Sequence, residues 1–330
     1  MSAQTPVCQL LQRQDMDYRD WLWVAPPRDT WLEAGQGRLL SADHSILEAW
    51  RERGRPVHSA LDSDLGSPPG AVLFWPKTHA LGEWWLLKLC QDLPEGTPLQ
   101  VVGENQGGIK RVLKVLAALG LGCRKLDSAR RCSLFDTKLR RVGIDPELAW
   151  TRFEAQELTL ISHPGVFGHG KLDEGTQLLL EALPELLPKG DCHVLDMGCG
   201  DGVIAAWLAR RGARVSAVDS NLFAVEATRR TLATNRLEGR ALSSDVYSAL
   251  NDERFDVIVS NPPFHQERSI DYGPAARLVE QAPAHLEKGG RLVLVANTFL
   301  PYADRLEAAF GSFRVIADDR RFRVYEVLKN

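Results

Sequence analysis

The chain has 330 residues, of which 44% are hydrophobic and 25% are charged, an ordinary globular balance and enough chain for two domains. The formal net charge of −3 excludes a bulk polycation. No apolar run is long enough for a membrane span, and no secretory signal is expected from the N-terminus. The six cysteines form no CxxC pair, which favours a reduced, cytoplasmic protein without a structural metal.

Charge is distributed unevenly along the chain. Residues 101–141 contain ten basic and three acidic residues. A basic segment on an otherwise acidic chain is a candidate face for binding phosphate groups, although the charge by itself is better explained by a solvated surface. The candidate contacts in this segment are Lys110, Arg111, Lys114, Arg130 and Arg131.

An internal repeat connects the two halves of the chain. Three pairs of segments match in the same order: 71–80 with 257–266, 93–120 with 286–311, and 126–135 with 317–326. Each pair shares its pattern of apolar runs, turns and polar ends, which indicates a duplication. The link falls near 145–160, so we expect one domain over 1–150 and a second over 151–330.

The second half begins with a loop and then alternates strands with helices. Residues 167–180 have loop character before a helix, with Asp173 or Thr176 as a cap. The position of this loop also suits a flap over a ligand, with Phe167 and Thr176 as candidate contacts. The patterns then predict strands at 192–198, 214–219, 255–260 and 291–297, and helices at 203–212, 222–235 and 275–290.

This alternation is typical of an α/β fold with a doubly wound, mostly parallel sheet. The end of the chain, residues 312–330, reads as two strands joined by a polar turn. We therefore expect an antiparallel hairpin to close the sheet.

A glycine loop follows the first strand of the second half, in the sequence VLDMGCGDG. Gly198 and Gly200, with Cys199 between them, let the backbone turn sharply and approach a ligand. No Lys-Ser/Thr pair follows, so the loop is not a P-loop. Asp196 before the loop would repel a pyrophosphate but suits a ligand with an ammonium and a sulfonium group. This pattern favours S-adenosylmethionine.

Two further carboxylates follow the next two strands. Asp219 ends the strand 214–219 and can accept hydrogen bonds from two ribose hydroxyls. Asp245 follows the next expected strand and could accept one from an adenine amino group. Asp219 alone could be a helix cap, but together with the glycine loop these carboxylates favour an adenosyl ligand.

The strand 255–260 ends in the sequence NPPF. Asn261 presents an amide oxygen and Pro262 a carbonyl oxygen freed from the sheet, so two acceptors can hold the two hydrogens of one amino group. Phe264 offers a face on which a planar group can stack. Asn-Pro-Pro is also a common turn. After an adenosyl-type loop, however, the pattern indicates methyl transfer to a planar amine, with no metal required.

The first half lacks these features. Trp75, Pro76 and Lys77 stand where the second half has Asn261 to Pro263, and no strand runs into a DxGxG loop. We expect the first copy to have lost both cofactor binding and chemistry, and to serve substrate binding or stability.

The whole chain resembles the ribosomal RNA small subunit methyltransferase C family, the 16S rRNA guanine-N2 methyltransferases. The matching stretches are VVGEN, LDSARRC, PGVF, QLLL, VLDMGCGDGV, SNPPFH and VANTFLPY. The resemblance implies two tandem Rossmann-like methyltransferase domains, of which the second is active. It also implies that Asn261, Pro262 and Phe264 hold a guanine of 16S rRNA in the 30S subunit, and that residues 196–200 hold S-adenosylmethionine. A cytoplasmic monomer is expected.

Other functions remain open at this stage. The NPPF motif is shared with enzymes that methylate adenine N6 or a protein glutamine, and a large-subunit rRNA guanine is a further candidate. The basic segment favours nucleic acid over protein as the substrate. A non-catalytic RNA-binding assembly protein is the alternative from another class, and the intact Asp196, Gly198, Gly200 and Asn261 argue against it.

Overall fold

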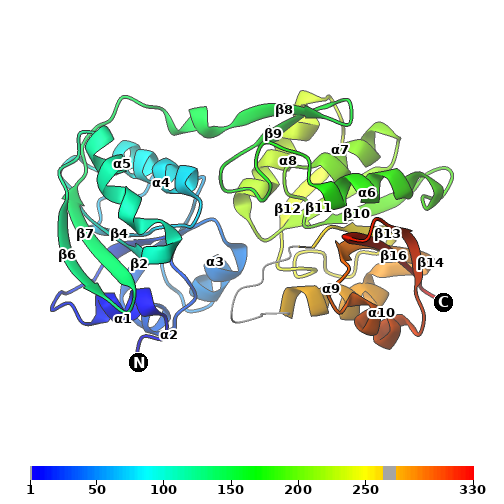
Figure 1. Ribbon diagram of the computed structural model, residues 1–330, viewed down its shortest axis with the longest axis horizontal. Coiled ribbons are helices and arrows are strands. Elements are labelled where there is room, and N and C mark those ends of the chain that lie inside the picture. Colours follow the sequence, from blue (N-terminus) through cyan, green and yellow to red (C-terminus); the bar gives the residue numbers. More distant parts are fainter. Residues whose placement is uncertain (1, 263–272) are drawn as a thin grey trace. The chain divides into compact units, whose positions relative to one another are not determined.

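The computed structural model describes residues 2–262 and 273–330 (Figure 1). The chain divides into two compact units, residues 1–150 and 151–330. In the described residues, each unit is built on one seven-stranded sheet, and a separate two-stranded hairpin precedes the second sheet. Phe264 and the rest of 263–272 lie outside the described residues.

The sheet of the second unit has the order β12-β11-β10-β13-β14-β16-β15. Its strands are β10 (His193–Met197), β11 (Arg214–Asp219), β12 (Arg240–Ser243), β13 (Phe255–Ser260), β14 (Leu286–Asn297), β15 (Arg314–Asp318) and β16 (Phe322–Leu328). The five strands β10 to β14 run parallel, and β16 pairs antiparallel with both β14 and β15. The strand order reverses between β10 and β13, and ligands of such sheets bind beyond the carboxyl ends of the strands at that point.

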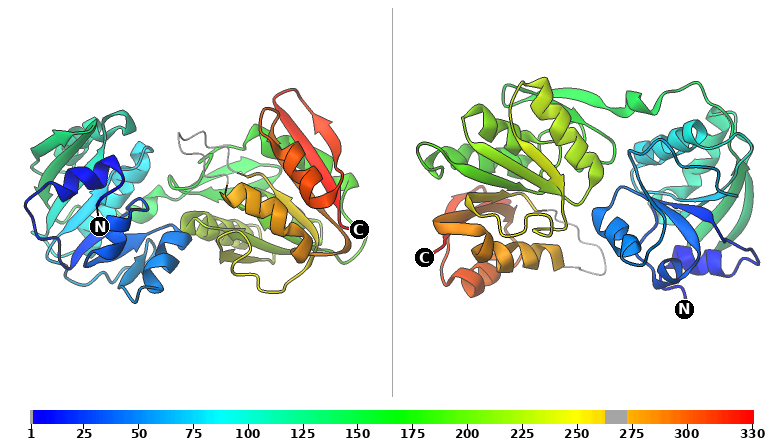
Figure 2. Two further views of the ribbon diagram at one scale, coloured as in Figure 1. Left: turned by 90° about the horizontal axis from the view of Figure 1, so that it is seen from below. Right: turned by 180° about the vertical axis from the view of Figure 1, so that it is seen from behind.

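Helices cover both faces of this sheet (Figures 1 and 2). The helical elements are α6 (Glu174–Ala182), η4 (Leu183–Glu185), α7 (Val203–Arg210), α8 (Leu222–Thr234), α9 (Gly273–His285) and α10 (Tyr302–Phe310). The hairpin of β8 (Thr151–Ala155) and β9 (Leu158–Ser162) packs beside α7 and α8.

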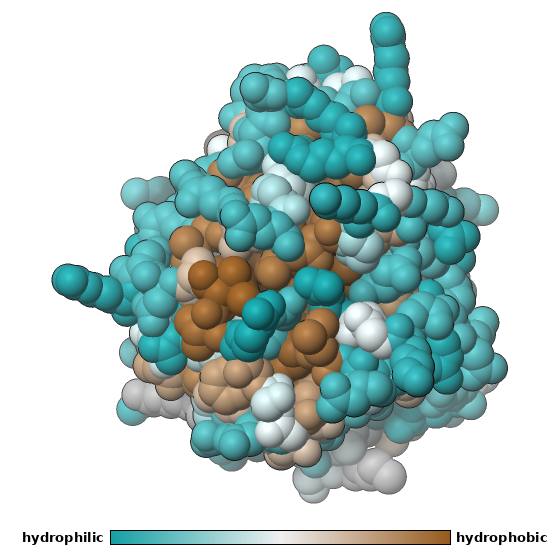
Figure 3. Space-filling model, turned by 90° about the vertical axis from the view of Figure 1, so that its right-hand side faces the viewer, coloured by the Kyte–Doolittle hydropathy of each residue, from teal (hydrophilic) through white to brown (hydrophobic). Residues whose placement is uncertain are grey.

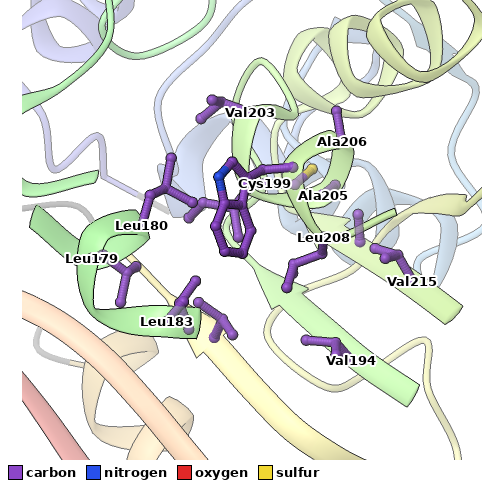
Figure 4. Packing of buried hydrophobic residues seen from close by; sticks show 14 of the residues in the cluster. Leu179, Leu180, Leu183, Val194, Cys199, Val203, Ala205, Ala206, Leu208 and Val215 are labelled. Atoms are coloured by element: carbon purple, nitrogen blue, oxygen red, sulfur yellow. The ribbon is translucent and has the colours of Figure 1, made fainter. Parts of the chain in front are cut away.

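Alternating side chains of the strands explain the two helical layers. Val194 of β10 belongs to a buried cluster with Leu179 of α6 and Leu208 of α7, whereas the next residue, Leu195, belongs to a cluster with Leu278 of α9. Successive residues of a strand point to opposite faces, so a continuous apolar strand buries both faces of the sheet. Figure 4 shows the first of these clusters, with Leu179, Leu208 and Val194 among its labelled members.

The outer surface is mixed in character. Figure 3 shows one face that is largely hydrophilic, with hydrophobic residues gathered near its centre. Large exposed hydrophobic residues of the second unit include Phe167, Phe299, Val315 and Leu328. Within the described residues, no helix is long and apolar enough to cross a membrane.

The sheet of the first unit has the same strand order as the sheet of the second unit. Its order is β3-β2-β1-β4-β5-β7-β6. The strands are β1 (Trp21–Val24), β2 (Gly37–Ser41), β3 (Val57–Ser59), β4 (Ala71–Phe74), β5 (Pro98–Glu104), β6 (Arg124–Ala129) and β7 (Cys132–Lys138). The first five pair in parallel, and β7 is antiparallel to β5 and β6. This agreement confirms the predicted fold class of two similar α/β domains.

The helical elements of the first unit are shorter on average. They are α1 (Pro6–Gln12), α2 (Thr30–Ala34), α3 (His44–Arg51), α4 (His79–Asp92), η1 (Asn105–Gly107), η2 (Ile109–Arg111), α5 (Val112–Ala118) and η3 (Pro146–Ala149).

Two expected boundaries were wrong. Residues 174–180, expected within a loop, belong to α6 (Glu174–Ala182). The helix predicted at 275–290 ends at His285, and residues 286–290 belong to β14. Leu286 pairs with Phe255, and the register then shifts before Arg291 pairs with Val257. Gly289 adopts a left-handed φ of +76°, which a helix interior does not accommodate.

Replacing Gly202 should destabilise the second unit. Gly202 has a φ of +82°, and a Cβ there would lie 2.8 Å from Thr228 Cα of the neighbouring helix α8. We expect Gly202→Ala to lower the free energy of unfolding by about 2–4 kcal/mol, from backbone strain and overpacking together. Gly212→Ala is the matched control, because Gly212 has a φ of +85° with open space around it. Equal losses for the two variants in chemical denaturation would show that the helix contact is unimportant.

Candidate functional site

The glycine loop leaves β10 and enters α7 beside the end of β11. The backbone N–H groups of Gly198 and Cys199 donate to the Val218 carbonyl at 2.8 and 3.0 Å, which ties the loop to β11. Gly198 and Gly200 have φ values of +80° and +55°, and a Cβ at either position would meet no atom within 4 Å. The loop therefore presents bare backbone to open space, as a binding site for a ligand requires. We call this surface of Gly198, Cys199 and Gly200 the glycine cradle.

Asp196 is a fully buried carboxylate beneath this cradle. Its Oδ2 accepts a hydrogen bond from the Ala205 N–H in the first turn of α7 at 3.0 Å. Its Oδ1 is buried and has no hydrogen-bond partner among the described residues. Burial, and to a smaller extent the charges of Asp219 and Asp201, raise the pKa of Asp196 to about 8. A cationic ligand would satisfy the unpaired oxygen and favour the ionised carboxylate.

Asp219 stands at the end of β11 and connects the loop to α8. Its Oδ2 accepts from the Gly200 N–H at 3.2 Å and its Oδ1 from the Asn221 N–H at 2.9 Å. The side chain is half-buried next to the cradle. It is thus both a structural anchor of the glycine loop and a carboxylate at the position expected for a ribose.

Asp245 has a partner that the sequence did not suggest. Both of its carboxylate oxygens accept hydrogen bonds from Arg277 of α9, each at 2.9 Å. This two-pronged ion pair ties the segment after β12 to α9. The expected contact of Asp245 with an adenine amino group stays a prediction, and it would have to share the carboxylate with Arg277.

Cys199 and Phe167 occupy different surroundings. The Cys199 side chain belongs to the hydrophobic cluster under α6 and α7, and burial raises the pKa of its thiol. Only its backbone is therefore positioned to line the cradle. Phe167 is 55% exposed in the loop that precedes α6. That loop is held near the start of α8, because the Asn221 side-chain N–H donates to the Gly165 carbonyl at 2.6 Å.

Asn261 lies directly after β13, at the same edge of the sheet as the cradle. Its Nδ2 donates to Asp173 Oδ2 at 2.8 Å and to Thr176 Oγ1 at 2.7 Å. Its Oδ1 is buried and has no partner among the described residues. Pro262, the next residue, is buried. The amide nitrogen is thus held by the first turn of α6, and the amide oxygen is left as a hydrogen-bond acceptor without a partner among the described residues.

The sequence suggested Asp173 or Thr176 as a helix cap, and Thr176 also as a cofactor contact. Asp173 is the cap of α6, since it accepts from the Thr176 N–H at 3.0 Å. Both side chains contact Asn261, which lies more than 80 residues away in the sequence. No local pattern could have indicated these contacts. Asp201 was also missed, and burial raises the pKa of its carboxyl to about 7.

The first unit differs at every corresponding position. The strand registers align β1 with β10 and β4 with β13, so that Val24 corresponds to Asp196 and Trp75 to Asn261. By the same registers Ala42 corresponds to Asp219. After β1 the chain continues as Ala-Pro-Pro-Arg in place of the glycine loop. The carboxylates and glycines of a cofactor site are absent at these described positions.

The basic candidates all lie exposed in the first unit. Lys110 and Arg111 belong to η2 and Lys114 to α5, whereas Arg130 and Arg131 form the turn between β6 and β7. The Asn105 N–H donates to the Arg131 carbonyl at 2.7 Å, which holds this turn beside the end of β5. The two parts of the basic segment therefore meet at one edge of the sheet. Among the described residues, no group of His, Cys, Asp and Glu could hold a metal ion.

The sheet order, the bare glycine cradle over a buried carboxylate and the oriented asparagine together define an α/β methyltransferase that uses S-adenosylmethionine. The family model described as "Methyltransferase small domain" matches residues 157–326. A second model, "Methyltransferase small domain N-terminal", matches residues 34–151.

The individual proteins that the chain resembles belong to a narrower class of methyltransferase. The chain is 66% identical to ribosomal RNA small subunit methyltransferase C of Chromohalobacter salexigens, over 100% of this chain and 99% of the relative. It is 36% identical to the ribosomal RNA small subunit methyltransferase C of Escherichia coli, over 99% of this chain and 98% of the relative. A solved T. thermophilus 16S rRNA N2 methyltransferase, in complex with AdoMet and guanosine, matches with a TM-score of 0.87, 28% identity and coverage of 99% and 92%. The chain belongs to the ribosomal RNA small subunit methyltransferase C family.

The raised pKa of Asp196 predicts how stability depends on pH. Between the ordinary value of 3.8 and about 8, the folded protein holds a proton that the unfolded chain has lost. The free energy of unfolding without cofactor should therefore fall as pH rises through this window, by at most about 1.4 kcal/mol per pH unit. Asp201 adds a parallel decline, but only up to about pH 7.

Asp196→Asn should remove the Asp196 contribution. Chemical denaturation at pH 7 and pH 8 isolates it, because both proteins carry Asp201 and the difference between their slopes belongs to Asp196. We expect the wild-type protein to lose stability over this interval and the variant to lose much less. Parallel slopes for the two proteins would mean that Asp196 is already ionised in the folded state.

Proposed function

We propose that the second unit transfers a methyl group from S-adenosylmethionine to the exocyclic N2 of a guanine in 16S rRNA. Family membership supports this function, as does the T. thermophilus relative, whose structure holds AdoMet and guanosine. The observation that carries it in this chain is the buried, unpartnered Oδ1 of Asn261 at the sheet edge next to the glycine cradle. An amino group is the complementary donor.

The residues of the cradle fit the cofactor. The unpaired Asp196 Oδ1 suits a cationic group, and the open space beside Gly198 and Gly200 admits a ligand close to the backbone. Asp219 lies next to this space and suits ribose hydroxyls. When bound, S-adenosylmethionine supplies the methyl group: the N2 lone pair forms the N–C bond while the C–S bond breaks and its electrons pass to sulfur. We propose one cofactor site per chain, since the first unit lacks these residues.

The chain's part in the reaction is orientation. The Asn261 oxygen accepts one N–H of the guanine amino group, and the Pro262 carbonyl accepts the other. Holding both N–H bonds directs the delocalised lone pair of the amine toward the methyl donor. Phe264, outside the described residues, is proposed to stack on the base. The methylated nitrogen is acidic enough to release its proton to water, so no side chain is needed as a base.

For the first unit we propose a role in holding the RNA. The exposed basic residues of η2, α5 and the β6–β7 turn support this role, because RNA binding rests largely on phosphate contacts. We further propose a cytoplasmic monomer that acts on the 30S subunit. All six cysteines are free, which suits a reducing compartment.

Asn261→Ala should slow the chemical step far more than it weakens cofactor binding. Loss of one preorganised acceptor is expected to lower turnover by about 10²–10³-fold. The measurement is single-turnover methylation of 16S rRNA at saturating cofactor, with nucleoside mass spectrometry to identify the product.

Trp75→Phe, at the corresponding position of the first unit, is the matched control for this measurement. Trp75 is buried against Gly82 and Gly103, so an aromatic replacement limits damage to the core. It should leave turnover nearly intact. Wild-type rates for Asn261→Ala, or an equal defect in folded Trp75→Phe protein, would refute the assignment of the active unit.

Reversing the charges of Lys110, Arg111 and Lys114 should weaken RNA binding. Fewer counterions would be released, so the dependence of log Kd on log salt should fall by about 2–3 in slope. Cofactor affinity should not change. Reversal of Arg19, Arg51 and Arg53, exposed in the same unit, is the control for net charge. The proposal fails if both triple variants bind RNA equally well in titrations over a range of salt.

A further inference from the structure

The amide of Asn261 is held by both hydrogens of its nitrogen. One points to Asp173 Oδ2 at 2.8 Å and the other to Thr176 Oγ1 at 2.7 Å. A carboxylate can only accept, so the nitrogen of the amide must face Asp173. A flipped amide would place its oxygen against that carboxylate, which repels it, and could keep only a bond from the Thr176 hydroxyl. The amide oxygen is thereby turned away from Asp173 and Thr176, and it is buried with no partner among the described residues.

The support for this amide is itself rigid. Asp173 and Thr176 are the cap and the third residue of α6, and the same Asp173 oxygen that holds Asn261 also accepts the Thr176 backbone N–H at 3.0 Å. Helix α6 packs through Leu179 and Leu180 into the core of the sheet. At Gly175 a Cβ would already lie 3.0 Å from the Phe322 ring, so this turn of the helix is tightly packed.

We propose that Asp173 and Thr176 are positioning residues for methyl transfer, which fix the Asn261 oxygen toward the substrate amine and strengthen it as an acceptor. This assignment rests on the proposed function of the site. It gives the first turn of α6 a role in the reaction as well as in the fold.

The charge of Asp173 has a direct consequence for the reaction. An amide that donates to a carboxylate is polarised, with more negative charge on its oxygen. The substrate nitrogen is neutral before transfer and becomes positive as the N–C bond forms. An oxygen with more negative charge therefore interacts more strongly with the transition state than with the bound substrate, which is the condition for acceleration. Burial of the oxygen limits screening by water.

The first unit supplies an independent comparison. Its helix α1 packs on β5, β6 and β7 as α6 packs on β14, β15 and β16. The cap of α1 is Thr5 and its third residue is Cys8, and Trp75 stands where the second unit has Asn261. The hydroxyl of Thr5 donates to Asp29 instead, at 2.8 Å. All three members of the arrangement are thus replaced together in the unit that lacks the other site residues.

The test compares Thr176→Val, which removes the hydroxyl at similar volume, with Thr176→Ser, which keeps it. Single-turnover methylation of 16S rRNA is measured at saturating cofactor, and cofactor affinity by calorimetry. Thr176→Val should lose about 10- to 100-fold in rate, as expected for a misplaced reacting group, with cofactor affinity unchanged. A loss of cofactor affinity that accounts for the slower rate would instead support the cofactor contact that the sequence suggested for Thr176, and would overturn its role as a positioning residue. Thr176→Ser should recover most of the rate. Thr97→Val is the control, because Thr97 is a buried threonine of the first unit whose hydroxyl donates to the Pro94 carbonyl.

Combining Thr176→Val with Asn261→Ala shows whether Thr176 acts through the amide. The double variant should be no slower than Asn261→Ala alone, because the positioned oxygen is already gone. A multiplied loss, or a Thr176→Val enzyme at the wild-type rate, overturns the assignment. Asp173→Asn keeps an oxygen for both hydrogen bonds and removes only the charge, so it should slow transfer by about tenfold. A wild-type rate for this variant overturns the role of the charge.

The same experiment separates this assignment from the function beneath it. A wild-type protein that does not methylate 16S rRNA would overturn the proposed function, and this assignment with it. An active wild-type protein whose rate is insensitive to Thr176→Val would overturn this assignment alone.

Discussion

The parallel pairing of β10 with both β11 and β13 is the constraint on which the rest of the site depends. Because β10 lies between these strands, their carboxyl ends meet at one edge of the sheet. The chain leaves β10 through the glycine loop and leaves β13 at Asn261. The pairing of these two strands is therefore enough to bring the glycine cradle and the Asn261 amide side by side. The layers of helices on both faces make this edge rigid, since every central strand is buried on two sides.

The two units show how one fold can keep its core and change its function. Strand order and register are the same in both, yet the residues at the strand ends differ at each site position. In the first unit Trp75 fills the space at the end of β4 and packs onto Gly82 and Gly103. The ring of Trp75 adds apolar packing to the core there, although its buried Nε1, like the Asn261 oxygen, has no partner among the described residues and costs free energy. The first unit therefore has a packed aromatic ring where the second has an amide whose oxygen is a hydrogen-bond acceptor without a partner among the described residues.

The second unit holds its site at the expense of stability. Asp196 and Asn261 each bury an oxygen without a partner among the described residues, and burial displaces the pKa of Asp196 far from its ordinary value. Such groups destabilise a protein until a ligand satisfies them. One oxygen lies near the carboxyl end of β10 and the other follows the carboxyl end of its neighbour β13. The Asp196 oxygen is complementary to a cationic group and the Asn261 oxygen to an amino group, so the protein itself indicates both kinds of ligand.

The sequence by itself determined the features that depend on neighbours along the chain. These include the alternation of strands and helices, the repeat, the glycine loop after Asp196 and the position of Asn261 at a strand end, because each follows from local periodicity or from a turn. The partners of these residues could not be read in the same way. Asp173 reaches Asn261 and Arg277 reaches Asp245 only after the sheet has assembled, and the Cys199 side chain turns into the core rather than toward the cradle. Tertiary structure decided these contacts, since hydrogen bonds between distant segments depend on packing geometry that no local pattern of residues encodes.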